Sequence, residues 1–397
     1  MNIATLSVAY LRARALNTVL NVLLLALGVA TITLLLLTMY QVEERMTRDA
    51  RGIDLVAGAK GSPMQVILSA IYHLDVPTGN VALKQAREIA KHRMIKKTIP
   101  LALGDSYKGY RVVGTNHDYL THYGAKVANG RLWEKHMEAV IGSEVAQREK
   151  LAVGAGITGA HGMGDGGSEH GDAPYKVVGI LAPSGTVLDR LVLVSVESVW
   201  LVHDEHTGTD APVSDEDKEI TALLIQYASP LAVAVLPRYI NNNSEMQAAS
   251  PAYETARLFA VIGIGVDVLR GFALVLILSA GLSLFIALYN ALNERRYDLA
   301  LMRTLGARPR TLMALMLLEG AILAGLGAVI GLALGHVLTE VLGQSLKAAQ
   351  QIAVTGWLWV PGELWLIAAA LVVGVVAALL PAWRAYRTDI AATLVRG

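Results

Sequence analysis

The sequence predicts a membrane protein with four transmembrane helices and a large α+β domain inserted between the first and second helices. Four segments are apolar and long enough to cross a hydrocarbon core, which needs about 20 helical residues. The composition adds a second observation, because 54% of the 397 residues are hydrophobic while 17% are charged, with a mean hydropathy of +0.45. That balance is typical of membrane helices combined with a water-exposed domain.

The first apolar segment, Thr18 to Tyr40, is uncharged and predicts the first span. Residues 1–17 contain two arginines and predict a short helix at the membrane surface, so that residues 1–45 form one N-terminal part. A signal peptide would have a shorter apolar core of about 7 to 15 residues, followed by a small-residue cleavage site. Neither feature is present, so we expect an anchor. Arginines before the span, with Glu43 and Glu44 after it, place the N-terminus in the cytoplasm.

Residues 46–251 have the composition of a folded domain, which the topology places outside the cytoplasm. Helical patterns occur at Ala82 to Lys97 and Ser143 to Glu149. Five β-rich runs predict strands at Tyr110 to Thr115, Ala139 to Gly142, Tyr175 to Leu181, Leu191 to Val196 and Thr221 to Tyr227. This mixture predicts an α+β domain with its own core. The Gly-rich segment Gly154 to Pro174 interrupts the strand pattern and favours two lobes.

The C-terminal part, residues 252–397, contains three further apolar segments. We expect spans at about 268–293, 312–338 and 364–383. Ala252 to Asn293 lacks proline and predicts a helix that projects beyond the bilayer, forming a stalk with an extension of the first span through Gln41 to Arg51. Thr339 to Glu363 is expected as an outer loop, whose tryptophans suit the membrane interface. The C-terminus then returns to the cytoplasm.

The third span carries two features that affect packing. Gly327, Gly331 and Gly335 recur at intervals of four, and small residues on one helix face allow a second helix to approach closely. Glu319 lies in the same apolar segment, where a carboxylate is costly unless it is paired. A bond to a neighbouring helix is the favoured interpretation, and a proton or substrate contact is the alternative.

The segment Glu294 to Thr311 separates the second and third spans and holds five arginines against two acidic residues. Short loops rich in arginine remain in the cytoplasm. This segment is therefore predicted to be a cytoplasmic turn, and it fixes the orientation of the other spans.

Several functional classes are excluded or disfavoured by the residues. The chain has no cysteine, so disulfides and thiolate sites are absent, and its net charge of +1 indicates no nucleic-acid partner. There is no phosphate-binding loop of the Gly-x-x-x-x-Gly-Lys-Ser/Thr type, no Gly-x-Ser-x-Gly elbow and no His-Glu-x-x-His motif. The match of Gly162, Gly164 and Gly167 to a dinucleotide fingerprint lies in a polar loop and is attributed to chance. We expect a protein that is not itself an enzyme.

Histidines are concentrated in the predicted outer domain. His161 and His170 lie in HGMGDGGSEHGD, and His203 and His206 lie in HDEH. Imidazole and carboxylate ligands suit zinc where thiolates are absent. A solvated loop that binds nothing is the favoured alternative, because neither spacing matches a known zinc motif.

The whole chain resembles the permease subunit of ABC transporters of the MacB/FtsX/LolC type. The resemblance is most specific at ERRYDLALMRTLGARPRTLMALMLLEG and at the closing PAWRAYRTDIAATLVRG. AVIGSEVAQREKLAVG and YKVVGILAPSGTVLDR are similar to the periplasmic core region of that family. Asp298 stands where the family more often has glutamate, and Met302 where it more often has leucine. The resemblance implies that ATPase coupling falls on Arg295, Arg296, Asp298, Arg303, Leu305, Gly306 and Ala307.

The resemblance also implies partners and a mechanism. It implies a homodimer or a pair of related permeases in the bacterial inner membrane, bound to two cytoplasmic ATPase subunits that carry ATP and Mg. ATP-driven movement would be transmitted through the stalk to the periplasmic domain, which is called mechanotransmission. A periplasmic adaptor or substrate-binding protein is a further expected partner, beside membrane lipid. The alternative hypothesis is a membrane-anchored zinc-binding or regulatory component.

Overall fold

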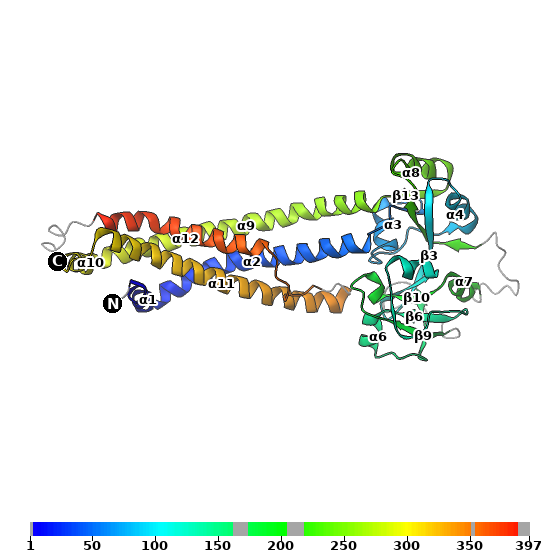
Figure 1. Cartoon of the computed structure of the whole chain (residues 1–397), viewed down its shortest axis with the longest axis horizontal. Helices are drawn as coiled ribbons and strands as arrows, with labels where there is room; N and C mark the ends of the chain where they lie inside the picture. Colours follow the sequence, from blue (N-terminus) through cyan, green and yellow to red (C-terminus); the bar gives the residue numbers. More distant parts are fainter. Residues whose placement is uncertain (1–2, 162–173, 205–217, 351–353, 388–397) are drawn as a thin grey trace. The chain divides into compact units, whose positions relative to one another are not determined.

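The computed structural model of the protein describes residues 3–161, 174–204, 218–350 and 354–387. The chain divides into two compact units, which we call the helical unit (residues 1–42 and 262–397) and the α+β unit (residues 43–261). Figure 1 shows long helices in the first and the strands in the second. The α+β unit is thus an insertion into the chain of the helical unit.

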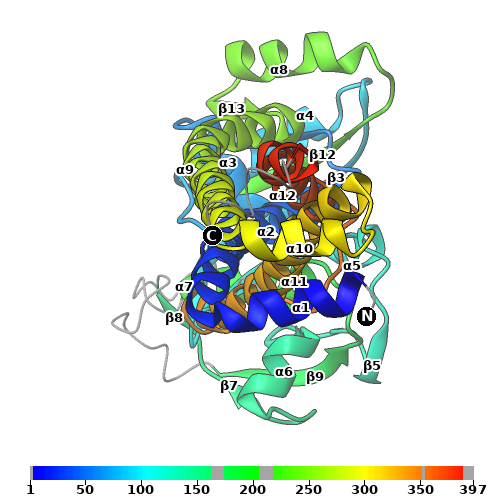
Figure 2. The same ribbon diagram turned by 90° about the vertical axis from the view of Figure 1, so that its left-hand side faces the viewer.

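The helical unit contains the four long helices α2 (Ala15–Asp49), α9 (Pro251–Glu294), α11 (Pro309–Gln350) and α12 (Gly362–Tyr386). Each is long and apolar enough to cross a membrane, which confirms the four predicted spans. Two short helices, α1 (Ile3–Ala13) and α10 (Arg296–Thr304), lie across the ends of the long helices, as Figure 2 shows. The last residues of α2 and the first residues of α9 belong to the α+β unit.

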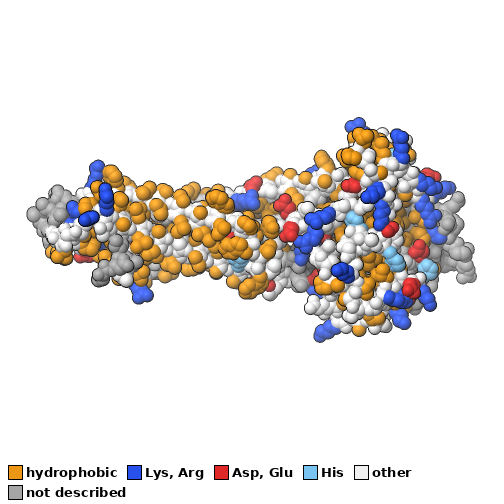
Figure 3. All heavy atoms as spheres, in the orientation of Figure 1, with side chains coloured by type: hydrophobic (Ala, Val, Ile, Leu, Met, Phe, Trp, Pro, Cys, Tyr) orange, Lys and Arg blue, Asp and Glu red, His pale blue; other side chains and the backbone are white. Residues whose placement is uncertain are grey.

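Hydrophobic side chains cover much of the surface of the long helices (Figure 3). Phe272, Leu278 and Leu282 of α9 are among the exposed apolar residues of this unit. The interior combines leucine and valine side chains such as Leu25 and Val29 with small residues such as Ala280, Ala324 and Ala328, which allow close helix packing. An apolar exterior, with small residues where the helices approach closely, is the arrangement expected of helices surrounded by lipid.

The helix of the third span is longer than predicted. α11 continues to Gln350, whereas the outer loop was expected to begin at Thr339. Residues 339–350 lack proline and consist largely of good helix formers, so nothing in the sequence stops the helix at Thr339. The connection to α12 therefore begins about three turns later than predicted.

The α+β unit is organised around one large sheet. Its strand order is β13-β1-β12-β3-β4-β10-β6-β9-β5, with β7 paired to β9 and β8 paired to β3, while β2 and β11 form a separate pair. The strands are β1 (Leu55–Ala59), β2 (Val81–Ala82), β3 (Ile95–Tyr107), β4 (Tyr110–Thr115), β5 (Val127–Gly130), β6 (Glu138–Ile141), β7 (Gly156–Ile157), β8 (Ala160–His161), β9 (Tyr175–Leu181), β10 (Val192–Ser195), β11 (Glu219–Ile220), β12 (Ala222–Tyr227) and β13 (Met246–Ala249). The helices are α3 (Pro63–Ala70), α4 (Leu83–Ala90), α5 (His117–His122), α6 (Ser143–Glu149), α7 (Val196–Asp204), α8 (Ala232–Asn243) and the 3-10 helix η1 (Val187–Arg190).

The long strand β3 divides this sheet into two lobes. Its first half pairs with β12 through Leu101, and its second half pairs with β4 from Ala102 onward, with a register shift after Leu103. Lobe 1 contains β13, β1 and β12 with α3, α4 and α8, and lobe 2 contains β4, β10, β6 and β9 with α6 and α7. The boundary therefore runs along β3 and not through the Gly-rich segment that suggested two lobes.

The predicted helix over Ala82 to Lys97 is only half right. The helix α4 ends at Ala90, and β3 begins at Ile95. Within α4, Leu83, Ala86 and Ile89 form the buried face, whereas the β-branched residues that follow favour a strand. The predicted strands at Tyr110 and Tyr175 coincide with β4 and β9, while β1, β3 and β13 were not predicted.

Candidate functional site

The segment between α9 and α11 forms a short helix with an exposed turn. Leu299 and Ala300 of α10 are fully buried, and Leu299 belongs to a cluster that includes Leu312 and Met316 of α11. The turn that follows contains Leu305, 80% exposed, and Gly306, whose φ of +98° lies in the left-handed region that favours glycine. The buried face of α10 thus holds the helix in place, while the turn presents an apolar side chain to solvent.

The other predicted coupling residues differ in exposure. Arg296 and Asp298 are exposed, and Arg303 and Ala307 are half-buried. Arg303 donates to the Ala307 carbonyl oxygen at 3.2 Å, which closes the turn. Four of the predicted residues, Arg296, Asp298, Leu305 and Gly306, therefore form a surface available to another protein.

Arg295 stands apart from this surface because its side chain points into the helical unit. Its Nη1 atom lies 2.9 Å from Oε1 of Glu319, and both residues are buried. Its guanidinium carbon lies 3.8 Å from the ring centre of Tyr10 in α1, an arrangement that favours a cation–π interaction. Arg295 therefore joins α1, α10 and α11 and is covered by them.

The three glycines of α11 that recur at intervals of four lie against α2. A Cβ atom at Gly331 would lie 2.7 Å from the carbonyl oxygen of Ala26, and one at Gly335 would lie 2.6 Å from Cβ of Thr33. A Cβ atom at Gly327 would lie 2.9 Å from Leu25. Any larger residue at Gly331 would require a shift of the α2 backbone, so the spacing by four residues reflects helix contact.

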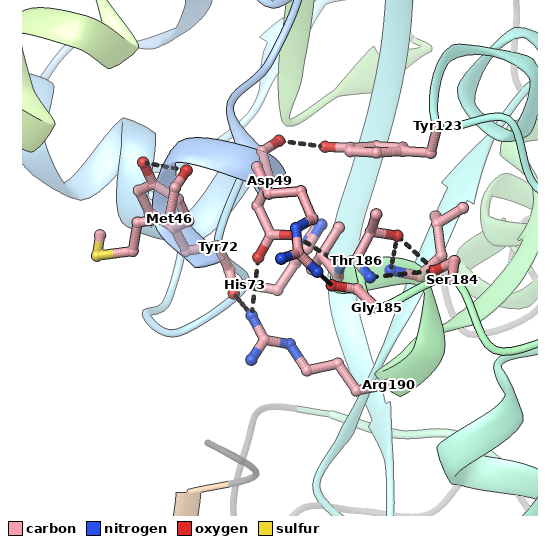
Figure 4. Close-up of polar contacts among 12 residues, drawn as sticks. Met46, Asp49, Tyr72, His73, Tyr123, Ser184, Gly185, Thr186 and Arg190 are labelled. Carbon is pink, nitrogen blue, oxygen red and sulfur yellow. Dashed lines mark hydrogen bonds and ion pairs between the residues drawn. The ribbon is translucent and has the colours of Figure 1, made fainter. Parts of the chain in front are cut away.

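A polar network in the α+β unit surrounds the end of α2 (Figure 4). The Asp49 carboxylate accepts a hydrogen bond of 2.8 Å from the Val187 N–H of η1, and its other oxygen lies 3.8 Å from Nη2 of Arg190. The Tyr123 hydroxyl donates to the Asp49 carbonyl oxygen at 2.7 Å. Arg190 also donates to the Tyr72 carbonyl oxygen at 2.9 Å. The last residue of α2 is therefore fixed to η1 and to the residue after α5.

Tyr72 connects the same network to α9. Its hydroxyl lies 2.7 Å from the Thr255 hydroxyl of α9 and 3.4 Å from the Met46 carbonyl oxygen of α2. The neighbouring His73 contacts the Tyr119 hydroxyl at 3.1 Å, and burial, followed by nearby arginine charges, lowers the pKa of His73 well below its usual value. Both helices that enter the unit are thus held by hydrogen bonds from one tyrosine.

Sequence reasoning did not find this network. The partners Asp49 and Val187 are separated by 138 residues, and no local pattern marks either of them. The pair of Arg295 and Glu319 is more clearly indicated by the sequence, because a single carboxylate in an apolar span is costly unless it has a partner.

The predicted zinc ligands are mostly beyond the described residues. His170 and His206 lie outside them, and for His161 in β8 and His203 in α7 only the backbone is described. Within the described part of the chain, no group of three or more His, Asp or Glu side chains is placed to hold a metal ion. The zinc site stays a prediction.

Two family descriptions match most of the sequence. Residues 18–236 match the MacB-like periplasmic core domain, and residues 270–390 match the FtsX-like permease C-terminal family. None of the curated proteins matches the sequence significantly.

Solved structures show similarity to the α+β unit. The periplasmic region of MacB from Actinobacillus actinomycetemcomitans has 12% identity and a TM-score of 0.35, with coverage of 54% of this chain and 97% of that one. The extracellular domain of the noncanonic ABC-type transporter YknZ from Gram-positive bacteria has 14% identity and a TM-score of 0.32, with coverage of 49% and 99%. Since the match to the core domain spans more than half of the sequence, the chain belongs to the MacB/FtsX-type family of ABC transporter permeases.

Proposed function

We propose that this permease component works by mechanotransmission, converting ATP hydrolysis on a partner into a change of shape in the α+β unit. Family membership implies pairing with a cytoplasmic ABC ATPase. The proposal places α10 and both termini on the cytoplasmic side of a bacterial inner membrane, and the α+β unit in the periplasm. ATP and Mg would be held by the ATPase, since the sequence has no phosphate-binding loop.

The continuity of α2 and α9 supports this proposal most strongly. The helix α9 runs from β13 to α10 with no proline after its first residue, and its 44 residues correspond to a length of roughly 66 Å at the rise of an α-helix. A hydrocarbon core is only about 30 Å thick, so the helix extends well beyond the membrane. Rigid helices with fixed ends can carry a displacement from one site to another.

Both ends of these helices are fixed by specific contacts. Near α10, Arg14 forms an ion pair with Glu294 at the end of α9, and Arg295 is held by Glu319. In the α+β unit, Asp49 ends α2 in the network described above, and Thr255 of α9 contacts Tyr72. A movement of α10 would therefore reach the α+β unit through contacts that resist slippage.

The turn after α10 provides a test of the proposal. Gly306→Val forces a β-branched side chain into the left-handed region, at a cost of roughly 1 to 2 kcal/mol. We expect this variant, and Leu305→Asp, to lose stimulation of the ATPase while the spans still assemble. ATPase activity is measured in the complex purified from native membranes, together with the amount of permease in the membrane.

Gly154→Val is a matched control, because Gly154 has the same φ of +98° and, like Gly306, has open space around its Cβ position. It lies in the α+β unit, so it should leave ATPase stimulation unchanged. Full stimulation in both Gly306→Val and Leu305→Asp, or purification of the chain without any ATPase, would contradict the proposal.

A zinc-binding or regulatory role is the second hypothesis, and it requires ligands from the two histidine clusters. Zinc is titrated calorimetrically into the full chain and into a variant with His161, His170, His203 and His206 all changed to Ala. The hypothesis expects at least tenfold tighter binding by the unaltered chain, about 1.4 kcal/mol. Equal affinity of the two proteins for zinc would contradict this hypothesis.

A further inference from the structure

A cavity of about 230 Å³ lies in the α+β unit between α4 of lobe 1 and α7 of lobe 2. The buried residues Leu83, Ala86, Ile220 and Leu223 supply apolar lining. Figure 1 shows α4 and α7 on the same side of β3, one above the other. The cavity therefore lies where the sheet passes from one lobe to the other.

Polar groups stand at the edges of this cavity. Arg87 of α4 and Glu197 of α7 are exposed, and neither forms an ion pair with any described residue. Thr98 and Asn116 are half-buried in the lining. The Asn116 side-chain oxygen accepts from the Asp118 N–H at the start of α5, which leaves the amide N–H₂ for another acceptor. The site thus combines an apolar interior with donors and charges of both signs.

We propose that this cavity binds one large apolar side chain of a peptide ligand. Its volume is below the range of about 300 to 1,000 Å³ that is usual for sites of drug-sized molecules, so it suits a single side chain. The peptide backbone would offer carbonyl oxygens to Arg87 and Asn116 and an N–H to Glu197. A lipid acyl chain would cover Thr98 and Asn116 without replacing their hydrogen bonds to water, which is unfavourable.

The connections of α2 and α9 to the lobes also link this cavity to the stalk that these two helices form. Both helices connect directly to lobe 1, since β1 follows α2 and β13 precedes α9, and the Asp49 carboxylate adds a bond from the end of α2 to η1 beside lobe 2. A displacement of α2 would act on lobe 1 through β1 and on η1 beside lobe 2 through Asp49, and an unequal response of the two would change the separation of the lobes across β3 and the width of the cavity. This linkage rests on the proposed mechanotransmission, whereas peptide binding itself does not.

The absence of cysteine makes a tethering experiment possible, because one introduced thiol is the only one in the chain. Ala90→Cys places it in the cavity lining on α4, and Glu88→Cys places it on the exposed surface of the same helix. The full permease–ATPase complex is equilibrated with disulfide probes that carry N-acetyl-phenylalanine amide, N-acetyl-serine amide or a plain hexyl chain. Intact-protein mass spectrometry gives the fraction of each adduct.

At Ala90→Cys we expect the phenylalanine probe to be retained about tenfold more than the serine probe, as burial of an aromatic side chain predicts. At Glu88→Cys the phenylalanine and serine probes should be retained equally. Thr98→Cys, on the β3 wall, gives an independent attachment point with the same expectation. Equal retention of both probes at both cavity positions would overturn the site, and retention of the hexyl probe above the phenylalanine probe would assign it to an acyl chain instead.

The same adducts test the linkage to the stalk. Retention of the phenylalanine probe should change by about fivefold between the nucleotide-free and the vanadate-trapped complex. Asp49→Ala, which removes the acceptor of the Val187 N–H, should abolish that change. Unchanged retention in a complex whose ATPase is stimulated normally would refute the linkage, whereas absent stimulation would instead refute the proposed function.

Discussion

In the helical unit, the buried carboxylate of Glu319 is bonded directly to a buried guanidinium, whereas in the α+β unit the buried carboxylate of Asp49 is bonded chiefly to a backbone N–H. The first contact spans 2.9 Å, and the nearest cation to Asp49 is Arg190 at 3.8 Å. Arg190 has a second acceptor, the Tyr72 carbonyl oxygen, while Arg295 has Glu319 as its one anionic partner among the described residues. Loss of the carboxylate should therefore have different consequences in the two units.

The largest effect is expected at Glu319. Glu319→Ala leaves the Arg295 charge buried without a counterion, and loss of one partner of such a pair typically costs about 3 to 5 kcal/mol. We expect a large fall in the thermal midpoint of the full chain in detergent, and loss of the folded bundle at 37 °C.

The double variant Arg295→Met, Glu319→Leu removes both charges and should recover most of that stability. It should nevertheless impair ATPase stimulation if Arg295 positions the turn after α10. A double variant as unstable as Glu319→Ala would show that the pair contributes more than charge compensation.

A smaller effect is expected at Asp49. Asp49→Ala leaves the Val187 N–H without its acceptor, at a cost of about 1 to 3 kcal/mol, while Arg190 keeps its bond to Tyr72. Asp49→Asn keeps an acceptor oxygen, so its stability should lie between that of Asp49→Ala and that of the unaltered chain. Unfolding of the α+β unit, followed by tryptophan fluorescence, measures the stability lost in each Asp49 variant. A loss of stability as large as that caused by Glu319→Ala would contradict the expected difference between the two units.

The smallest effect concerns a charge pair nearer the surface and depends on pH. Two short hydrogen bonds from Arg131, with backbone N–H groups of Glu134 and Lys135, lower the pKa of Glu138 to about 2. Because the pKa is about 4.5 in the unfolded chain, this stabilisation is complete above pH 4.5 and is lost as the pH falls toward 2. The thermal midpoint should fall between pH 5 and pH 2.5 by more in the unaltered chain than in Glu138→Gln.

Much of the architecture follows from local sequence. Long uncharged segments fix the four spans, and alternation of apolar residues fixes strands such as β4 and β9. The strand β3 escaped prediction because its Lys96 and Lys97 continue the polar pattern of α4, and because its interior contains Pro100 and Gly104. Pairing with β12 and β4 on either side overrides these weak local preferences.

The candidate site likewise has parts that local sequence predicts and parts that it does not. The basic turn and the glycines of α11 are visible in the sequence because spacing and composition are local properties. The Asp49 network is not, since Val187, Arg190 and Tyr123 are brought to it only by the completed fold. The cavity between α4 and α7 is likewise formed by residues from both lobes.

The pairing of β1 has a consequence for biosynthesis. β1 is among the first parts of the α+β unit to be translated, yet its two neighbours in the sheet are β12 and β13, which are among the last. Such distant pairing is slow and leaves strand edges open in the meantime. The nascent domain must therefore wait, already anchored by its first apolar helix, until β13 has emerged immediately ahead of α9. The strand that completes the pairing of β1 and the helix α9 are thus consecutive in translation.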